Sequence, residues 1–185
     1  SRLVNEIMPE DMMNNIDDLE MALENMDMDS IQDALSQLSE DMEKIEKDLD
    51  RYLEIFKRFQ AEQKLDEIQN RLQNLIEQQG ALDNEIDGAD ENPSSMDRLA
   101  QEEQRNLDEF KNIQSLVEDA SEMIEQFNES TANELSELSD SKLSENIMQN
   151  LSDIVQSLSN KNNQDAAAQS KESLSNMNMM MQQMM

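Results

Sequence analysis

An apolar repeat runs through residues 31–59 of the chain. Its members are separated alternately by four and three positions, without interruption. A period of 3.5 residues places them all on one face of a helix, as lengthwise packing against another helix requires. We therefore expect a coiled-coil helix whose core seam consists of Ile31, Leu35, Leu38, Met42, Ile45, Leu49, Tyr52, Phe56 and Phe59.

The same kind of spacing predicts helices on both sides of this seam. Apolar residues before it indicate a short helix over 9–27, because Pro9 suits the first turn of a helix. The repeat resumes after the seam, so the long helix is predicted to cover 30–87. Both glycines and the second proline fall within 80–94, and this stretch is therefore predicted to be a tip loop.

A return helix is predicted over 95–159, either as one helix or as two helices that meet at 128–132. The equal length of 30–87 favours one helix. A turn then leads to a methionine-rich last helix over 163–185.

The chain ends resemble each other, since each reads as helix, turn and helix. The predicted fold is a single all-α domain over 1–185. It is an elongated antiparallel helical hairpin, a coiled coil, whose short helices pack at its base to form a four-helix bundle.

Composition and charge agree with this fold and restrict the function. The chain has 2 Gly, 2 Pro and 3% aromatic residues, which is typical of a few long helices. Its 43 acidic and 14 basic residues give a formal charge of −29, which repels nucleic acid and anionic membranes. No apolar run is long enough to cross a bilayer. We therefore expect neither nucleic-acid binding nor direct membrane insertion by this segment.

Acidic residues of the predicted tip resemble half of a calcium loop. Asp83, Glu85 and Asp87 have the spacing of the first three oxygen ligands, and Gly88 follows where such a loop turns sharply. The position of the final bidentate glutamate is Ser94, which cannot supply two carboxylate oxygens. The alternative is an acidic, solvated turn, and the expected metal content is none.

Methionine is concentrated at the end of the chain, with six in the last nine residues. Met177, Met180, Met181 and Met184 follow a helical stripe, and flexible methionines suit both core packing and adaptable binding surfaces. These four are the candidate interaction surface; packing within a seam and binding of Cu(I) are the alternatives. With no His, no Cys and no phosphate-binding glycine loop, the chain is expected to have no cofactor and no enzymatic activity.

Three segments resemble a large, uncharacterised bacterial membrane-protein family. They are residues 43–82, the sequence RLAQEEQRNL at 98–107, and the closing turn that Gln164, Asp165, Ala166 and a Met/Gln-rich end follow. In that family, N-terminal transmembrane helices precede a long extracytoplasmic coiled-coil region of unknown function. The resemblance implies a soluble fragment of a membrane-anchored protein, on the periplasmic or extracytoplasmic side of a bacterial membrane.

The function expected from the sequence is a non-enzymatic scaffolding module that binds a protein partner through helix faces. The alternative is a holdase-type chaperone that grips apolar clients with methionine-rich amphipathic helices. The seam closes either within the chain or on a second copy in a homodimer. In either case a charge at Phe56 is expected to destabilise the fold by several kcal/mol.

Overall fold

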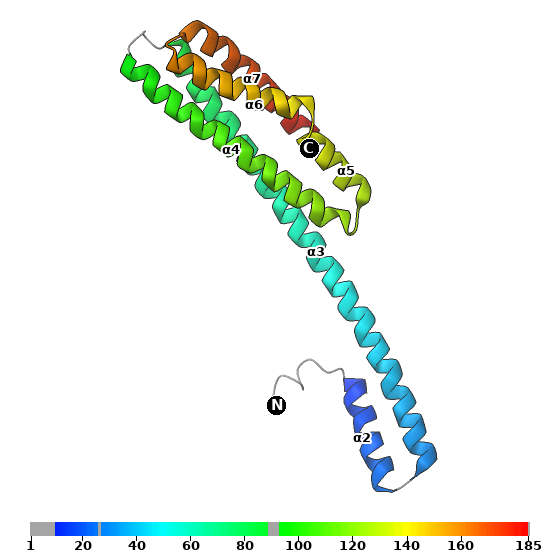
Figure 1. Ribbon diagram of the computed structural model, residues 1–185. Coiled ribbons are helices and arrows are strands. Elements are labelled where there is room, and N and C mark those ends of the chain that lie inside the picture. Colours follow the sequence, from blue (N-terminus) through cyan, green and yellow to red (C-terminus); the bar gives the residue numbers. More distant parts are fainter. Residues whose placement is uncertain (1–9, 26, 89–92, 185) are drawn as a thin grey trace. The chain divides into compact units, whose positions relative to one another are not determined.

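The computed structural model describes residues 10–25, 27–88 and 93–184, and the elements found there are all helices. They are α2 (Glu10–Glu24), α3 (Met28–Asp87), α4 (Pro93–Glu125), α5 (Glu129–Ser139), α6 (Lys142–Ser159) and α7 (Asn163–Gln183), labelled in Figure 1. This confirms the all-α prediction. The chain divides into two compact units, residues 1–56 and 57–185, and we describe each by itself.

The N-terminal unit is a hairpin of α2 and the first part of α3. The Asp27 carboxylate accepts hydrogen bonds from the backbone N–H groups of Asp29 (3.2 Å) and Ser30 (3.4 Å), so Asp27 caps α3. Between the two helices, the Asn15 amide donates to the Asp41 carboxylate at 2.5 Å. The buried apolar residues of this unit's described part are two alanines, Ala22 and Ala34. Two helices alone thus enclose very little core.

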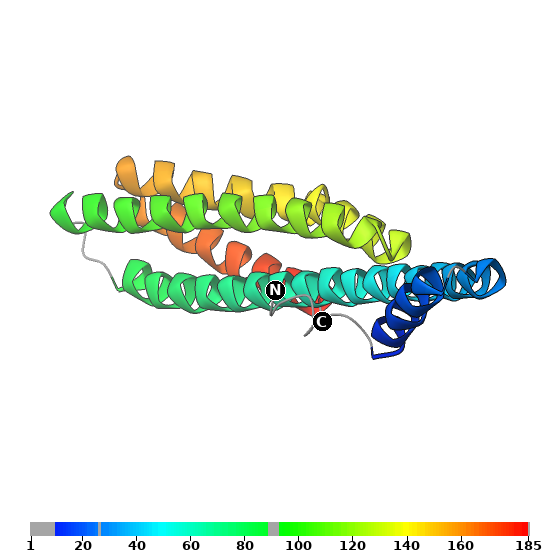
Figure 2. The ribbon, with the colours of Figure 1, turned by 90° about the horizontal axis from the view of Figure 1, so that it is seen from below.

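The C-terminal unit is an antiparallel helical bundle. Ion pairs join α3 to α4 at Lys64–Asp119, Arg71–Glu109 and Glu85–Arg98, with numbers rising along one helix and falling along the other. Helix α7 runs antiparallel to α3, since Lys171 pairs with Asp87 and the Gln69 amide donates to the Met184 carbonyl. Helix α6 packs against both α4 and α7, and Figures 1 and 2 show these helices side by side.

The continuous return helix predicted over 95–159 is wrong. Helix α4 ends at Glu125, and α5 then packs back against α4, so the chain reverses direction. Asn128 caps α5 by accepting from the Thr131 N–H at 3.2 Å, and Ser141 caps α6 by accepting from the Ser144 N–H at 3.2 Å. Each cap satisfies an N–H group that a continuous helix would have bonded internally, which is why three helices stand here.

The predicted tip and base also need correction. Helix α3 continues through Gly80 to Asp87, so the connection to α4 is shorter than the 80–94 loop expected. The Lys171–Asp87 ion pair (2.7 Å) places the beginning of α7 beside the end of α3. The α6–α7 turn, where Lys161 has a φ of 60°, therefore lies at the end where α3 finishes. The bundle is built there and not at the opposite end, where the resemblance between the two chain ends had placed it.

The core of this bundle contains the second half of the apolar repeat together with stripes from α4, α6 and α7. Four-helix packing needs one apolar stripe from each helix, and each stripe here has the spacing of three and four residues that this requires. The largest fully buried side chains are Phe110, Ile68, Leu72, Leu75, Ile86, Met96, Leu99, Ile113, Ile147, Leu151, Ile154 and Leu158.

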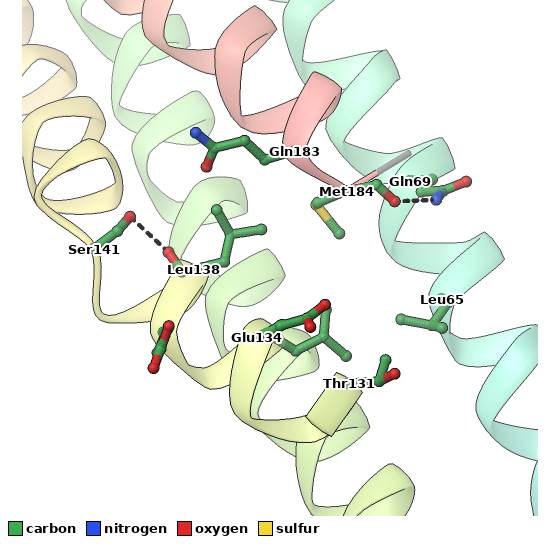
Figure 3. Close-up of a pocket in the computed structure, with 10 residues that line it drawn as sticks. Leu65, Gln69, Thr131, Glu134, Leu138, Ser141, Gln183 and Met184 are labelled. Carbon is green, nitrogen blue, oxygen red and sulfur yellow. Dashed lines mark hydrogen bonds between the residues drawn. The ribbon is translucent and has the colours of Figure 1, made fainter. Parts of the chain in front are cut away.

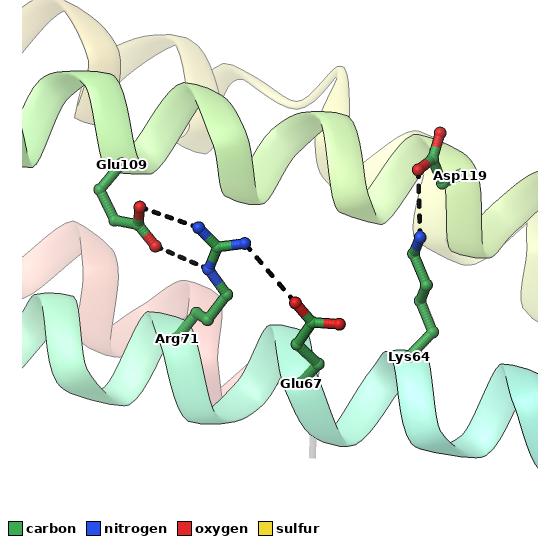
Figure 4. Close-up of polar contacts among 5 residues, drawn as sticks. All are labelled: Lys64, Glu67, Arg71, Glu109 and Asp119. Atoms are coloured by element: carbon green, nitrogen blue, oxygen red, sulfur yellow. Dashed lines mark hydrogen bonds and ion pairs between the residues drawn. The ribbon is translucent and has the colours of Figure 1, made fainter.

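We expect Arg71→Lys to lower the free energy of unfolding by up to about 1 kcal/mol. The Arg71 guanidinium donates to both oxygens of Glu109, from Nε at 2.7 Å and Nη2 at 2.9 Å, and a lysine cannot make this paired contact (Figure 4). The same bonds hold the pKa of Glu109 below its ordinary value, so their contribution is lost as the pH falls. Urea unfolding at pH 7 and pH 3 measures the effect, and an equal loss at both pH values would contradict it.

Candidate functional site

Most of the apolar seam predicted over 31–59 is exposed in this chain. Tyr52 is 68% exposed, Leu49 61% and Phe56 55%, and Leu35, Met42 and Phe59 are exposed as well. Only Ile31, Leu38 and Ile45, on the side of the helix that carries the buried Ala34, are partly covered. Of the two closures expected for the seam, closure within the chain is therefore not found for most of these nine residues. The pattern identified the apolar face correctly, but α2 is a short helix and covers only part of that face.

We call the uncovered group Leu49, Tyr52, Leu53, Ile55 and Phe56 the exposed aromatic face. All five are at least half exposed, and all belong to the N-terminal unit. Three of them continue the 3.5-residue repeat, while Leu53 and Ile55 widen it on its two sides. Contiguous apolar surface of this kind is uncommon on a monomeric protein and marks interaction sites.

A groove with acidic edges adjoins this face in the same unit. Its apolar lining consists of Met12 from α2 with Met42, Ile45 and Leu49 from α3; its polar lining consists of Ser39, Glu43, Glu46 and Asp50. The combined feature is an apolar strip that begins between two helices and continues along one.

The methionines predicted as an interaction surface lie in the bundle instead. Met177 and Met180 are fully buried, while Met181 and Met184 are partly buried against the same core. Helix α7 is the fourth helix of the bundle, so its apolar stripe is used for packing. Met177 and Met180 are therefore not accessible, while Met181 and Met184 keep part of their surface exposed.

A layer of polar side chains crosses the core of the bundle. The Gln79 amide donates to Glu103 Oε2 (3.1 Å) and to Ser170 Oγ (3.3 Å), and Asn106 donates to Gln79 Oε1 (2.8 Å). Glu103 is fully buried, and its Oε1 finds no hydrogen-bond partner in the described part of the chain. Burial raises the pKa of Glu103 to about 8, although the bond from Gln79 acts in the opposite direction. Glu103 is therefore largely protonated at neutral pH.

The partners and the burial of this polar layer do not indicate a catalytic site. Among the described residues, the hydrogen-bond partners of Glu103 and Gln79 are amides and a serine hydroxyl, which supply no second titratable group. General acid–base work needs a group that reaches a substrate, and every member of the layer is buried.

The structure does not bring the three calcium candidates together. Asp83, Glu85 and Asp87 all belong to α3, where side chains two positions apart point in different directions and cannot converge on one cation. Glu85 pairs with Arg98 and Asp87 with Lys171. Across the described residues, no group of three or more acidic side chains is placed to hold a metal ion.

A pocket lies where α7 ends inside the C-terminal unit (Figure 3). Its apolar lining comes from three leucines and a methionine, Leu65, Leu135, Leu138 and Met184, and Glu134 and Glu137 line it as well. Two hydrogen bonds secure its walls, from Gln69 to the Met184 carbonyl (3.0 Å) and from Ser141 to the Leu138 carbonyl (2.7 Å). None of the buried unpaired polar atoms found among the described residues belongs to its lining, so the pocket indicates no particular ligand.

Comparison with protein-family models, with curated proteins and with solved structures found no match to this chain. Within the described residues, no helix combines the length and the apolar character that a membrane crossing requires.

Proposed function

We propose that this chain is a non-enzymatic scaffolding module that binds a protein partner through the exposed aromatic face of its N-terminal unit. The observation that carries the proposal is the exposure of Tyr52, Phe56 and their neighbours in a segment with an uninterrupted heptad repeat. Leaving such side chains in water costs free energy that burial against another helix recovers. A repeat of 3.5 residues selects a helical partner.

The C-terminal unit supports this role because its core does not involve the exposed aromatic face. It has its own core, three capped helices after the reversal at Glu125, and ion pairs between neighbouring helices. The stability of this unit is thus built from residues other than those of the exposed face. The binding face can then gain or lose a partner while the bundle stays folded.

We extend the proposal to location on the strength of the sequence resemblance alone. The module would stand on the extracytoplasmic side of a bacterial membrane as part of a membrane-anchored protein. The segments that carry the resemblance include residues 43–82, which span the exposed aromatic face.

A holdase-type chaperone is the second candidate. Exposed aromatic side chains favour it, because they suit apolar clients of any sequence. The methionine-rich helix does not support it, because Met177 and Met180 are buried. The client surface of a holdase would have to be the same aromatic face.

A photo-crosslinking amino acid in place of Phe56 tests the proposal in cells that produce the protein. A scaffold gives one discrete cross-linked species, whereas a holdase gives a broad smear of many client masses. The same amino acid at Glu118, an exposed position on α4, serves as the matched control. Cross-linking at position 56 that does not exceed cross-linking at position 118 would contradict both functions.

A further inference from the structure

The apolar seam of α3 divides into a covered row and an open row. Up to Ile45, its partly covered members repeat every seven residues, and so do its exposed members. Seven residues are close to two turns of a helix, so each set forms one row along α3. The covered row is Ile31, Leu38 and Ile45. The open row is Leu35, Met42, Leu49 and Phe56, and each of these side chains is more than half exposed.

Helix α2 lies on the side of the covered row. There the Asp41 carboxylate accepts a hydrogen bond from the Asn15 amide at 2.5 Å and pairs with Lys44 at 3.1 Å. That side of the seam is therefore occupied within the hairpin. The open row faces no such helix, and it leaves room for a third helix beside α2 and α3.

The groove between α2 and α3 contains part of the open row and has acids along its edge. Glu43, Glu46 and Asp50 each directly follow an apolar residue of the groove, so they form a row on one side of the apolar floor. Lys47 pairs with Glu43 at 2.7 Å, whereas neither Glu46 nor Asp50 forms an ion pair with a base in the described part of the chain. The described lining of the groove includes no basic residue. Its edge therefore carries uncompensated negative charge.

An apolar floor with an acidic edge fits a basic amphipathic helix. Such a helix places apolar side chains at every third or fourth position, where they can enter the groove. Met12 and Met42 of the groove suit this role, because flexible methionine side chains adapt to different apolar surfaces. Lysine or arginine beside the apolar stripe of the partner would lie near Glu46 and Asp50. From 35 to 56 the open row offers about 30 Å, or roughly six helical turns.

A second copy of this chain does not provide that charge. Its formal charge is −29, and its own α2 contains six acidic residues and no base. Pairing two such hairpins would bring acidic surfaces together, which costs free energy. A partner with bases beside its apolar stripe avoids this repulsion.

We propose that the acid-edged groove and the exposed aromatic face bind a basic amphipathic helix of a partner protein, which packs as a third helix beside α2 and α3. This inference rests on the proposed function, because it gives the chemistry of the partner of the same face. The open row supplies the apolar contact, and Glu46 and Asp50 select lysine or arginine. Salt is expected to weaken the complex, because it screens pairs of exposed charges.

A displayed peptide library tests this selection without knowledge of the partner. Each peptide is a helix with an apolar heptad stripe, and the positions that flank the stripe carry lysine or glutamate with equal frequency. Peptides that bind the immobilised wild-type protein are sequenced. Lysine is expected to exceed glutamate by about 10-fold on at least one flank, which corresponds to about 1.4 kcal/mol.

Charge reversal assigns the selection to the groove. Glu46→Lys combined with Asp50→Lys should abolish the preference for lysine and favour glutamate. Both residues are exposed, so the hairpin should keep its helix content, which circular dichroism checks. The matched control combines Glu118→Lys with Glu122→Lys, two exposed acids that are also four positions apart, on α4. It changes the net charge equally and should select lysine as strongly as the wild type does.

Four results would overturn the proposal. No peptide binds above background, lysine and glutamate are selected equally, or the two double variants reduce the preference for lysine to the same extent. The fourth is a wild-type dimer in light scattering that Phe56→Glu dissociates, which would assign the face to a second copy. One discrete photo-cross-link from position 56 to a different protein would keep the scaffolding function in each of the first three cases, so the two failures are distinguishable.

Discussion

Replacing Phe110 with alanine is expected to lower the free energy of unfolding by about 3–5 kcal/mol. Phe110 is fully buried and is the largest of the fully buried side chains in the bundle. Its removal forfeits the transfer free energy of the ring and leaves a cavity in the core of the bundle that rigid helices cannot close. Urea unfolding followed by circular dichroism measures the loss as a lower midpoint with little change in slope.

Phe56 is the matched control, because it is the same residue type on the other unit and is 55% exposed. The sequence pattern ranked it as a core residue, and the structure reverses that ranking. At concentrations where single chains prevail, Phe56→Ala should change the free energy of unfolding by no more than about 0.5 kcal/mol. Equal losses from the two substitutions would show that Phe56 is buried within one chain.

Glu103→Gln is expected to stabilise the protein increasingly as the pH rises. The folded state keeps Glu103 protonated up to a pKa of about 8, whereas the unfolded chain releases this proton near the ordinary 4.5. Between these values the unfolded state gains by ionising, so the wild-type protein loses stability at up to about 1.4 kcal/mol per pH unit. Below about pH 4.5 the acid is neutral in both states and contributes no slope. Glutamine resembles the protonated acid in shape and charge, so it removes the loss.

The difference between Glu103→Gln and wild type should therefore be near zero at pH 4 and several kcal/mol at pH 8. Urea midpoints at a series of pH values measure it. Glu118→Gln on the same helix removes an exposed carboxylate and serves as the control for net charge. A difference that stays constant with pH would mean that Glu103 is ionised in the folded protein.

The apolar repeat predicted helices reliably, because a period of three and four residues arises only from helical packing. It did not predict what covers each helix. Residues 49–56 and residues 68–75 follow the same pattern, yet the first group is exposed and the second is buried. The difference is that α4 and α7 pack along the second half of α3. Which part of α3 they cover depends on the positions of the turns between the helices. The equal-length argument for a single return helix failed because the chain reverses after α4 into α5, which Asn128 caps, and Ser141 then caps a further helix, α6.

The polar layer could have been found from the same pattern. The α4 repeat of Met96, Leu99, Phe110 and Ile113 keeps its spacing only if Glu103 and Asn106 occupy core positions. Gln79 interrupts the α3 repeat in the same way. What the pattern could not supply was that these interruptions meet at one level of the bundle, because the pairing of α3 with α4 depends on the length of their connection.

The contact of Gln79 with Glu103 and Asn106 affects the register in which α3 and α4 pack. Leucine and isoleucine stripes are nearly interchangeable between heptads, so α4 could slide by seven residues along α3 and still bury an apolar stripe. Such a slide would set Glu103 against apolar side chains and separate it from Gln79, with several buried polar atoms left unpaired. The polar layer thus favours one register of α4 against α3. Burying the Glu103 carboxyl lowers the stability of the bundle, but it also disfavours registers in which α4 is shifted by one heptad along α3.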